Sequence, residues 1–338
     1  MVEDTLLARA VATLRAGGLV VMPTETVYGL GADARNPHAV AGIFALKGRP
    51  SSHPLIVHVA ADARLEDWAD AVPEVAQRLA EAFWPGPLTL VLPRGPAVPP
   101  EVTGGQATVG LRCPAHPVAQ RLLQAFGGGI AAPSANRYGR ISPTTSDHVR
   151  DEFGALCPLV LEGGPCEVGL ESTIVGFAPG VLRILRSGRI GRDELAAVAG
   201  PGWRVLSGAA ADSPRVPGST LSHYAPRTPL ACLPYDALRD AHVRLAAAGR
   251  RIGVLSRHAA PAGATAAGPW LEAGQTPETF GKRLYADLRR LDAAGCQQLL
   301  VEAVPAGEAW DAARDRLQRA ATRESIDGFP PHGGAGQP

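Results

Sequence analysis

Two cationic side chains lie two residues apart in the segment Lys47-Gly48-Arg49-Pro50. Gly48 and Pro50 favour irregular backbone just past a predicted helix end, and two cations on such a loop can bind a polyphosphate. Lys47 and Lys282 are the only lysines in a chain whose other strongly basic residues are arginines, which favours a specific role for Lys47. The pair by itself is weak evidence, and a solvated surface pair is the alternative.

Another cation ends the predicted strand Thr108–Arg112. Because side chains alternate along a strand, Thr108 and Arg112 share one face, and the apolar Val109 and Leu111 lie on the other. The Arg112 guanidinium is a planar fork that matches a carboxylate. An arginine at an exposed strand end is the alternative.

The segment Ala131–Asn136 follows a short apolar strand and consists of small residues with one hydroxyl and one side-chain amide. Small side chains permit close approach of the backbone, and Ser134 and Asn136 can hydrogen-bond to a phosphate, a ribose or a metal-bound water. An ordinary turn that contains serine and asparagine is the alternative.

A histidine interrupts the apolar predicted strand Leu55–Val59. His58 could bind a polar ligand from this position. A lone histidine in such a strand is more often a buried core residue, so the pattern alone favours the core interpretation.

These residues need a scaffold, and the hydrophobic pattern predicts one of the α/β class. Strands and helices alternate irregularly over residues 1–200, which predicts a mixed sheet. Asn36 is the predicted N-cap of the helix that ends at Lys47, with Pro37 as its first residue. Residues 201–229 are rich in Pro, Gly and Ser and are predicted to form an interdomain linker, whereas residues 230–330 predict a small parallel βαβ domain without a G-x-G-x-x-G motif.

The composition narrows the class of protein. A length of 338 residues favours two domains, and 33 basic against 32 acidic residues give a net charge of +1, which provides no general attraction to nucleic acid. Five separated cysteines without a CxxC pair argue against a zinc site and a disulfide framework. No signal peptide or membrane span is predicted, so a cytoplasmic location is expected. Walker, G-x-S-x-G, H-E-x-x-H and kinase motifs are absent from the sequence.

Taken together, seven short motifs resemble the YrdC/Sua5 family and occur in its order. The similarity continues through residues 217–218, 223–226 and the βαβ region, which indicates the two-domain Sua5 type. It covers nearly the whole chain. The motifs are residues 23–30 (PTETVYGL), 47–50 (KGRP), 54–58 (PLIVH), 84–89 (WPGPLT), 109–114 (VGLRCP), 133–136 (PSAN) and 171–174 (ESTI).

The resemblance implies a YrdC-like twisted mixed sheet with helices, followed by a smaller Rossmann-like parallel domain. It implies the synthesis of L-threonylcarbamoyladenylate and pyrophosphate from L-threonine, bicarbonate and ATP, the first step of N6-threonylcarbamoyladenosine (t6A) formation at tRNA position 37. The implied partners are these substrates, Mg²⁺ bound with ATP, a downstream threonylcarbamoyl transferase and a weak RNA contact, without a membrane.

The resemblance also assigns site residues, position by position, with no metal ligand assigned directly. Two positions depart from the family pattern, because Tyr138 replaces a small residue and Ser219 follows Pro217-Gly218 where methionine is common. The implied catalytic residues are Lys47, Arg49, Ser134 and Asn136; the ATP-binding residues are Arg49, His53, Thr108, Ser134, Ser142, Arg186 and Tyr224; and the L-threonine-binding residues are Thr26, His58, Arg112, Ala132 and Ser172.

Two other functions fit a basic concave fold of this kind. A double-stranded RNA-binding module is the alternative from a different class, and the low net charge counts against it. The carbamoyl-adenylate step of hydrogenase maturation uses related domains, but zinc-finger and acylphosphatase segments are missing from this sequence.

Overall fold

The computed structural model describes residues 2–218 and 224–322. The chain forms two compact units: one contains residues 1–138 and 142–219, and the other contains residues 139–141 and 220–338. The predicted linker, residues 201–229, is thus divided between the two units. His223, in the motif at residues 223–226, lies outside the described residues.

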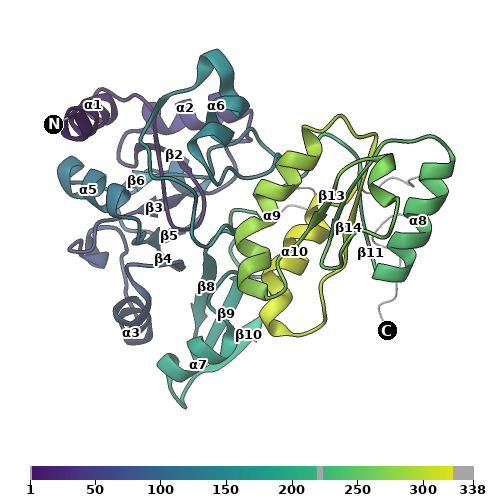
Figure 1. Cartoon of the computed structure of the whole chain (residues 1–338). Helices are drawn as coiled ribbons and strands as arrows, with labels where there is room; N and C mark the ends of the chain where they lie inside the picture. Colours follow the sequence, from purple (N-terminus) through teal and green to yellow (C-terminus); the bar gives the residue numbers. More distant parts are fainter. Residues whose placement is uncertain (1, 219–223, 323–338) are drawn as a thin grey trace. The chain divides into compact units, whose positions relative to one another are not determined.

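Within the described part of the first unit, a ten-stranded sheet runs through the centre (Figure 1). The order is β10-β9-β8-β4-β5-β3-β6-β2-β1-β7, with parallel pairs such as β3 and β5 beside antiparallel pairs such as β4 and β5. The predicted mixed sheet is therefore confirmed. The strands are β1 (Val20–Met22), β2 (Gly29–Asp33), β3 (Ile56–His58), β4 (Leu88–Pro93), β5 (Thr108–Arg112), β6 (Ile130–Ala131), β7 (Leu159–Val160), β8 (Thr173–Ala178), β9 (Val181–Arg186) and β10 (Arg204–Ser207).

Helix α2 of the first unit begins and ends at capping residues. The predicted N-cap of α2 is confirmed, because the Asn36 side chain accepts hydrogen bonds from the amides of His38 and Ala39 at 3.0 and 3.2 Å. Gly48 ends this helix in the left-handed conformation, with φ of 62°. The helices are α1 (Val2–Arg15), α2 (Pro37–Lys47), α3 (Glu74–Phe83), α4 (Pro100–Thr103), α5 (Pro117–Phe126), α6 (Ser146–Phe153) and α7 (Arg192–Ala199), with 3-10 helices η1 (Leu65–Asp67) and η2 (Gly154–Leu156).

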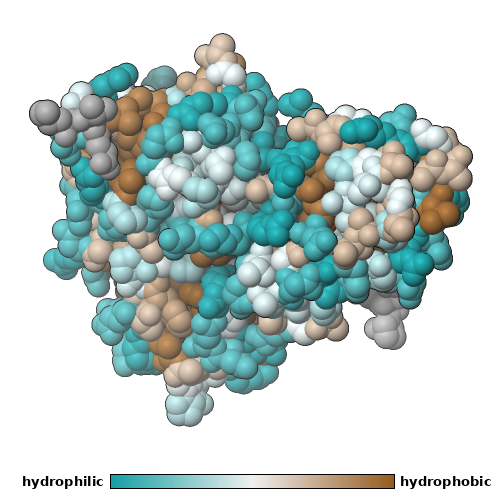
Figure 2. Space-filling model, viewed as in Figure 1, coloured by the Kyte–Doolittle hydropathy of each residue, from teal (hydrophilic) through white to brown (hydrophobic). Residues whose placement is uncertain are grey.

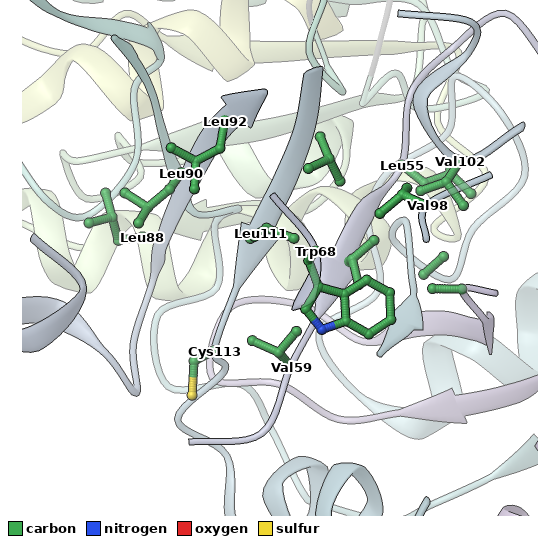
Figure 3. Packing of buried hydrophobic residues seen from close by; sticks show 14 of the residues in the cluster. Leu55, Val59, Trp68, Leu88, Leu90, Leu92, Val98, Val102, Leu111 and Cys113 are labelled. Carbon is green, nitrogen blue, oxygen red and sulfur yellow. The ribbon is translucent and has the colours of Figure 1, made fainter. Parts of the chain in front are cut away.

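The main hydrophobic core lies against one face of this sheet (Figure 3). Alternate residues of β4 point into it, so that Leu88, Leu90 and Leu92 are fully buried there. Val109 and Leu111 enter the same core from β5, as the alternation predicts. The side chains that alternate with these residues must therefore lie on the opposite face.

On that opposite face a small cluster combines Ile56, Val91 and Ile174 with Val216. Val216 comes from the segment that was predicted to be a linker, and strand β10 in the same segment pairs in parallel with β9. The sequence did not predict β10, because this strand at the sheet edge has no fully buried residue and hence no clear alternation.

In its described part, the second unit contains a four-stranded parallel sheet in the order β11-β14-β12-β13, which confirms the predicted parallel βαβ domain. Helices α9 and α10 lie together on one side of this sheet, and α8 lies on the other (Figure 1). The elements are β11 (Leu230–Leu233), α8 (Tyr235–Ala247), β12 (Ile252–Ser256), η3 (Ala264–Ala267), β13 (Trp270–Glu272), α9 (Pro277–Asp292), β14 (Gln298–Glu302), η4 (Glu308–Trp310) and α10 (Asp311–Ala320).

Hydrophilic residues cover most of the face drawn in Figure 2, and hydrophobic residues occur there in scattered patches. Among the described residues, the large hydrophobic side chains with strong exposure are Leu156 and Val243. No helix in this part of the chain has the length and apolar character that a membrane crossing needs.

Candidate functional site

Strand alternation collects polar side chains on the sheet face opposite the main core. Thr89 alternates with the buried leucines of β4, Arg112 ends β5, and His58 ends β3 beside it in parallel register. Ser172 immediately precedes β8, and its hydroxyl lies 2.7 Å from that of Thr89. The structure thus brings three predicted threonine-binding residues, His58, Arg112 and Ser172, onto neighbouring strand ends.

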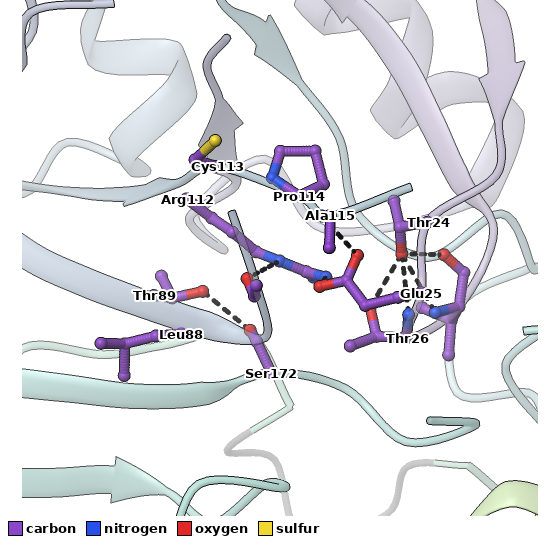
Figure 4. Close-up of polar contacts among 12 residues, drawn as sticks. Thr24, Glu25, Thr26, Leu88, Thr89, Arg112, Cys113, Pro114, Ala115 and Ser172 are labelled. Atoms are coloured by element: carbon purple, nitrogen blue, oxygen red, sulfur yellow. Dashed lines mark hydrogen bonds and ion pairs between the residues drawn. The ribbon is translucent and has the colours of Figure 1, made fainter. Parts of the chain in front are cut away.

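Arg112 is buried, and its guanidinium pairs with a carboxylate that the sequence analysis did not select. Arg112 Nη2 donates to Glu25 Oε1 at 2.6 Å, and both side chains are less than a tenth exposed. Glu25 Oε2 accepts a hydrogen bond from the Ala115 amide at 3.0 Å. Figure 4 shows Arg112 between the Thr89–Ser172 pair and the loop that carries Glu25. The alternative of an arginine at an exposed strand end is therefore wrong.

Thr26, another predicted threonine-binding residue, follows Glu25 in this loop. Its hydroxyl lies 2.8 Å from that of Thr24, and the Thr24 hydroxyl also accepts hydrogen bonds from the amides of Thr26 and Val27 at 3.2 Å. This turn explains the short loop conformation after β1, because Thr24 satisfies backbone donors that a strand would otherwise pair.

His58 is 3% exposed and remains uncharged. Burial and then the positive charge of Arg112 lower the pKa of His58 from 6.5 to about 3. Its Nδ1 atom is buried and has no hydrogen-bond partner in the described part of the chain. A neutral imidazole beside Arg112 can exchange hydrogen bonds with a ligand without adding charge.

Arg186, a predicted ATP-binding residue, contacts the predicted threonine-binding Ser172. Its Nε and Nη2 atoms donate to the Ser172 carbonyl oxygen at 3.1 and 2.9 Å, and Nη2 also donates to the Ser172 hydroxyl at 3.1 Å. Arg186 Nη1 donates to the carbonyl oxygen of Pro217 at 2.9 Å. One guanidinium thus connects the polar sheet face to the segment after β10.

Lys47 joins two motifs that are far apart in sequence. Its Nζ donates hydrogen bonds to the backbone carbonyl oxygens of Ser134, at 2.5 Å, and of Asn136. Lys47 and Arg49 are 3% and 7% exposed, so the solvated surface interpretation is wrong. Burial, and then the nearby charge of Arg49, hold the pKa of Lys47 well below its ordinary value. The structure therefore places the K-x-R pair against the loop that carries Ser134 and Asn136.

The other predicted ATP-binding residues lie in different surroundings. The Ser142 hydroxyl is buried and donates to Glu171 Oε1 at 2.6 Å. His53 is half-buried and contacts the Tyr138 ring edge-on at 5.4 Å between centroids. Thr108 is half-buried at the start of β5, on the same strand face as Arg112.

Two predicted positions are held by contacts within their own unit. Tyr224 belongs to the second unit, where its ring stacks on Tyr285 with 5.6 Å between centroids. The Ala132 amide donates to the carbonyl oxygen of Ile56 at 2.9 Å, so this donor is occupied by the sheet.

Sequence reasoning missed Glu25, Thr89 and Glu171. Thr89 could have been found, because it alternates with the leucines of the predicted strand at residues 88–92. Glu25 and Glu171 stand in loops, where no periodicity indicates which side chains are buried. Their membership in the quoted motifs was the available signal.

Residues 12–188 match the family model of Sua5, YciO and YrdC proteins, described as telomere recombination, and residues 190–322 match the C-terminal domain of threonylcarbamoyl-AMP synthase. The chain belongs to the threonylcarbamoyl-AMP synthase family. The threonylcarbamoyl-AMP synthase of Bacillus subtilis is 40% identical over 326 residues, which cover 94% of each chain. These matches confirm the resemblance seen in the seven motifs and do not favour the RNA-binding alternative.

Solved structures and shorter members of the threonylcarbamoyl-AMP synthase family agree with this assignment. A crystal structure of Pyrococcus abyssi Sua5 complexed with L-threonine is 36% identical, covers 94% of both chains and superposes with a TM-score of 0.86. A putative threonylcarbamoyl-AMP synthase of Mycobacterium tuberculosis is 39% identical over 194 residues, which are 57% of this chain and 89% of the relative. Some members of the family therefore match little more than half of this chain.

Proposed function

We propose that this chain is an L-threonylcarbamoyladenylate synthase, an enzyme that converts L-threonine, bicarbonate and ATP into threonylcarbamoyl-AMP and pyrophosphate. Full-length relatives carry this activity as their name, and the related Pyrococcus abyssi structure contains L-threonine. Within this chain, the observation that carries the proposal is the buried Arg112, held by Glu25 among polar side chains of one sheet face.

The threonine end of the proposed site is built on Arg112. Its Nη1 atom makes no hydrogen bond to the described residues, which leaves N–H donors for the substrate carboxylate. The hydroxyls of Thr26 and Ser172 and the neutral His58 are the groups that we assign to the rest of the amino acid. Since the pair with Glu25 fixes the guanidinium before the ligand arrives, little reorientation is needed on binding.

The nucleotide end combines the K-x-R pair with the loop of Ser134 and Asn136. We assign Arg49 and Lys47 to the phosphates, and the contacts of Lys47 with the two loop carbonyls add a positioning role. His53, Thr108, Ser142, Arg186 and Tyr224 remain assigned to ATP. Apart from Tyr224, the residues assigned to ATP lie in the first unit.

No residue in this proposal acts as a nucleophile. The threonine amine attacks carbon dioxide or bicarbonate and forms a carbamate, with loss of a proton or of water. A carbamate oxygen then attacks the α-phosphate of ATP, the bond to the β-phosphate breaks, and pyrophosphate leaves. Catalysis arises from the alignment of the two substrates and from cations beside the phosphates, which is the usual balance in phosphoryl chemistry.

Magnesium enters this proposal together with ATP. The described residues include no group of three or more His, Cys, Asp and Glu side chains that could hold a metal. The donors that do fit Mg²⁺ are phosphate oxygens, with the Ser134 hydroxyl and the Asn136 amide as neutral oxygen ligands nearby. The ion would neutralise phosphate charge, while the protein residues orient the substrates.

The proposed product is an activated carbamoyl group attached to AMP. We place this reaction at the first step of t6A formation at position 37 of tRNA, in the cytoplasm, where a threonylcarbamoyl transferase receives the product. An activated acyl adenylate hydrolyses readily, so transfer to such an enzyme must follow its synthesis closely.

The test is incubation with ATP, Mg²⁺ and bicarbonate and with each amino acid in turn, followed by a pyrophosphate assay and mass spectrometry of the nucleotide product. We expect pyrophosphate release to require both bicarbonate and L-threonine, because the carbamate is the acceptor. Equal release of pyrophosphate without threonine would contradict the proposal.

A further inference from the structure

Contacts in addition to the ion pair with Arg112 hold Glu25 in place. One carboxylate oxygen accepts from Arg112 at 2.6 Å, and the other accepts from the Ala115 amide at 3.0 Å. The Glu25 backbone carbonyl accepts from the Val168 amide at 2.7 Å, so main chain and side chain are both held. A carboxylate fixed in this way cannot move aside when a ligand binds Arg112.

Three titratable side chains near this ion pair, those of His58, Cys113 and Cys166, are uncharged. His58 remains neutral, with a pKa of about 3, mainly because it is buried. Burial also raises the pKa of the Cys113 thiol to about 11 and that of the Cys166 thiol to about 12. The positive charge of Arg112 is therefore balanced by the negative charge of Glu25, and these three neighbouring side chains add no charge of their own.

The next charged residues are again one cation and one anion, Arg186 at the end of β9 and Glu171 in the loop before β8. Arg186 bonds to Ser172, and Glu171 accepts from the buried Ser142 hydroxyl. The threonine end of the site therefore has a net charge close to zero. A buried site of this kind disfavours a ligand that brings an uncompensated charge, whereas a zwitterion preserves the balance.

On the basis of the proposed function, we propose that Glu25 is a specificity-determining residue that makes the ammonium group of the substrate a requirement for binding. Arg112 attracts any carboxylate, but the fixed Glu25 beside it repels a ligand that is only an anion. An amino acid offsets this repulsion with its ammonium group. Glu25 thus discriminates against hydroxy acids that match threonine in shape but lack the amine, through a built-in unfavourable interaction.

The experiment compares L-threonine with (R)-3-hydroxybutanoate, which has the same carbon skeleton, carboxylate and hydroxyl but no amine. Isothermal titration calorimetry gives the dissociation constant of each ligand for the full-length wild type, for Glu25→Gln and for Glu101→Gln. Glu101 is an exposed glutamate in α4 and serves as the matched control. The ratio of the two dissociation constants measures the selectivity for the amine.

We expect the wild type and Glu101→Gln to bind threonine at least about tenfold more tightly than (R)-3-hydroxybutanoate, the size of a charge interaction over about 12 Å at an effective dielectric constant near 20. Glu25→Gln leaves Arg112 uncompensated, so the selectivity ratio should fall by about tenfold or more. Glu25→Asp keeps the charge and should retain at least part of the selectivity. If Glu25 had a purely structural role, Glu25→Gln would weaken the binding of both ligands equally.

Several results would overturn this inference. A Glu25→Gln protein that loses affinity for both ligands with an unchanged ratio would show that Glu25 only supports the fold. If that variant does not fold, the wild type decides, because equal affinity for the two ligands rules out the selectivity. That result would leave the proposed function intact, whereas a wild type that binds no threonine would overturn the proposed function and this inference together.

Discussion

The pair of Arg112 and Glu25 illustrates how a partner charge stabilises a buried cation at a binding site. Removing a guanidinium from water costs several kcal/mol unless a partner charge and hydrogen bonds compensate it, and breaking such a pair typically costs about 3–5 kcal/mol. The two side chains are 4% and 8% exposed, and their closest atoms are 2.6 Å apart. The pair therefore contributes to the stability of the loop as well as to the orientation of Arg112.

Substitution of Arg112 by lysine tests the fork geometry that we assign to the threonine carboxylate. Lysine keeps the charge but cannot pair with Glu25 and a ligand in one plane, so threonine affinity should fall by about 1.5–3 kcal/mol. Calorimetry of threonine binding measures this loss. Arg64→Lys, with a side chain 76% exposed, is the control and should bind as the wild type does. An unchanged dissociation constant for Arg112→Lys would remove Arg112 from the site.

The neutral state of His58 should be visible in the pH dependence of stability. The folded protein holds the pKa of His58 at about 3, below the ordinary 6.5, so only the unfolded chain takes up this proton as the pH falls below 6.5. The contribution of the neutral His58 to the free energy of unfolding is complete above pH 6.5. It should decrease by about 2 kcal/mol between pH 7 and pH 5.

Urea unfolding of the first unit at these two pH values measures this effect. His58→Gln cannot be protonated, so its free energy of unfolding should fall by about 2 kcal/mol less than that of the wild type over this range. Parallel losses in the two proteins would mean that His58 has the same pKa in the folded and unfolded states.

At the scale of elements, Lys47 connects helix α2 to the loop after β6. The last residue of the helix supplies hydrogen bonds to carbonyl oxygens of Ser134 and Asn136, which are 87 and 89 residues further along the chain. The left-handed Gly48 turns the chain directly after this residue, so that Arg49 follows on a separate path.

Lys47→Met keeps an unbranched side chain that is one atom shorter and removes these hydrogen bonds. The loop should then lose its fixed position, and the rate of pyrophosphate release should fall by about ten- to a hundredfold, because small displacements of positioning groups are costly. Amide hydrogen exchange of residues 134–138 should become faster. The matched control is Lys282→Met, which replaces the exposed second lysine of the chain. Wild-type exchange and activity in Lys47→Met would contradict this role.

The sequence predicts the elements here better than it predicts their contacts. Alternation along β5 placed Arg112 opposite Val109 and Leu111, and the capping residues placed the ends of α2, because these signals are local. The contact between Arg112 and Glu25 joins residues 87 positions apart, and no local pattern encodes it. The same holds for the bonds of Lys47. The assignment of individual site residues to ATP or threonine stays a prediction.

The division into units shows a similar limit. A Pro, Gly and Ser-rich composition predicted a linker for residues 201–229, yet residues 204–207 form β10 and Val216 is buried on the sheet. Composition indicates low helix and strand propensity, but an edge strand needs only a free neighbour with which to pair. The first unit continues to residue 219.

For the molecule as a whole, the inclusion of β10 and Val216 in the first unit predicts where the chain can be truncated. A chain that ends at Gly218 retains β10, the packing of Val216 against Ile56 and Ile174, and the hydrogen bond from Arg186 to Pro217. It should fold and bind threonine with an affinity close to that of the full-length protein, because the groups that we assign to threonine all lie in the first unit.

A chain that ends at Gly200 should behave differently. It loses β10 and exposes the cluster beneath Val216, whose burial alone contributes about 1.5–3 kcal/mol. Arg186 also loses its hydrogen bond to Pro217. Its hydrogen bonds to Ser172 should then weaken, and threonine affinity should fall. Urea unfolding and calorimetry of the two truncated chains measure both effects. Equal stability and equal threonine affinity would mean that residues 201–218 act only as a connection, and that β10 and Val216 do not support the site.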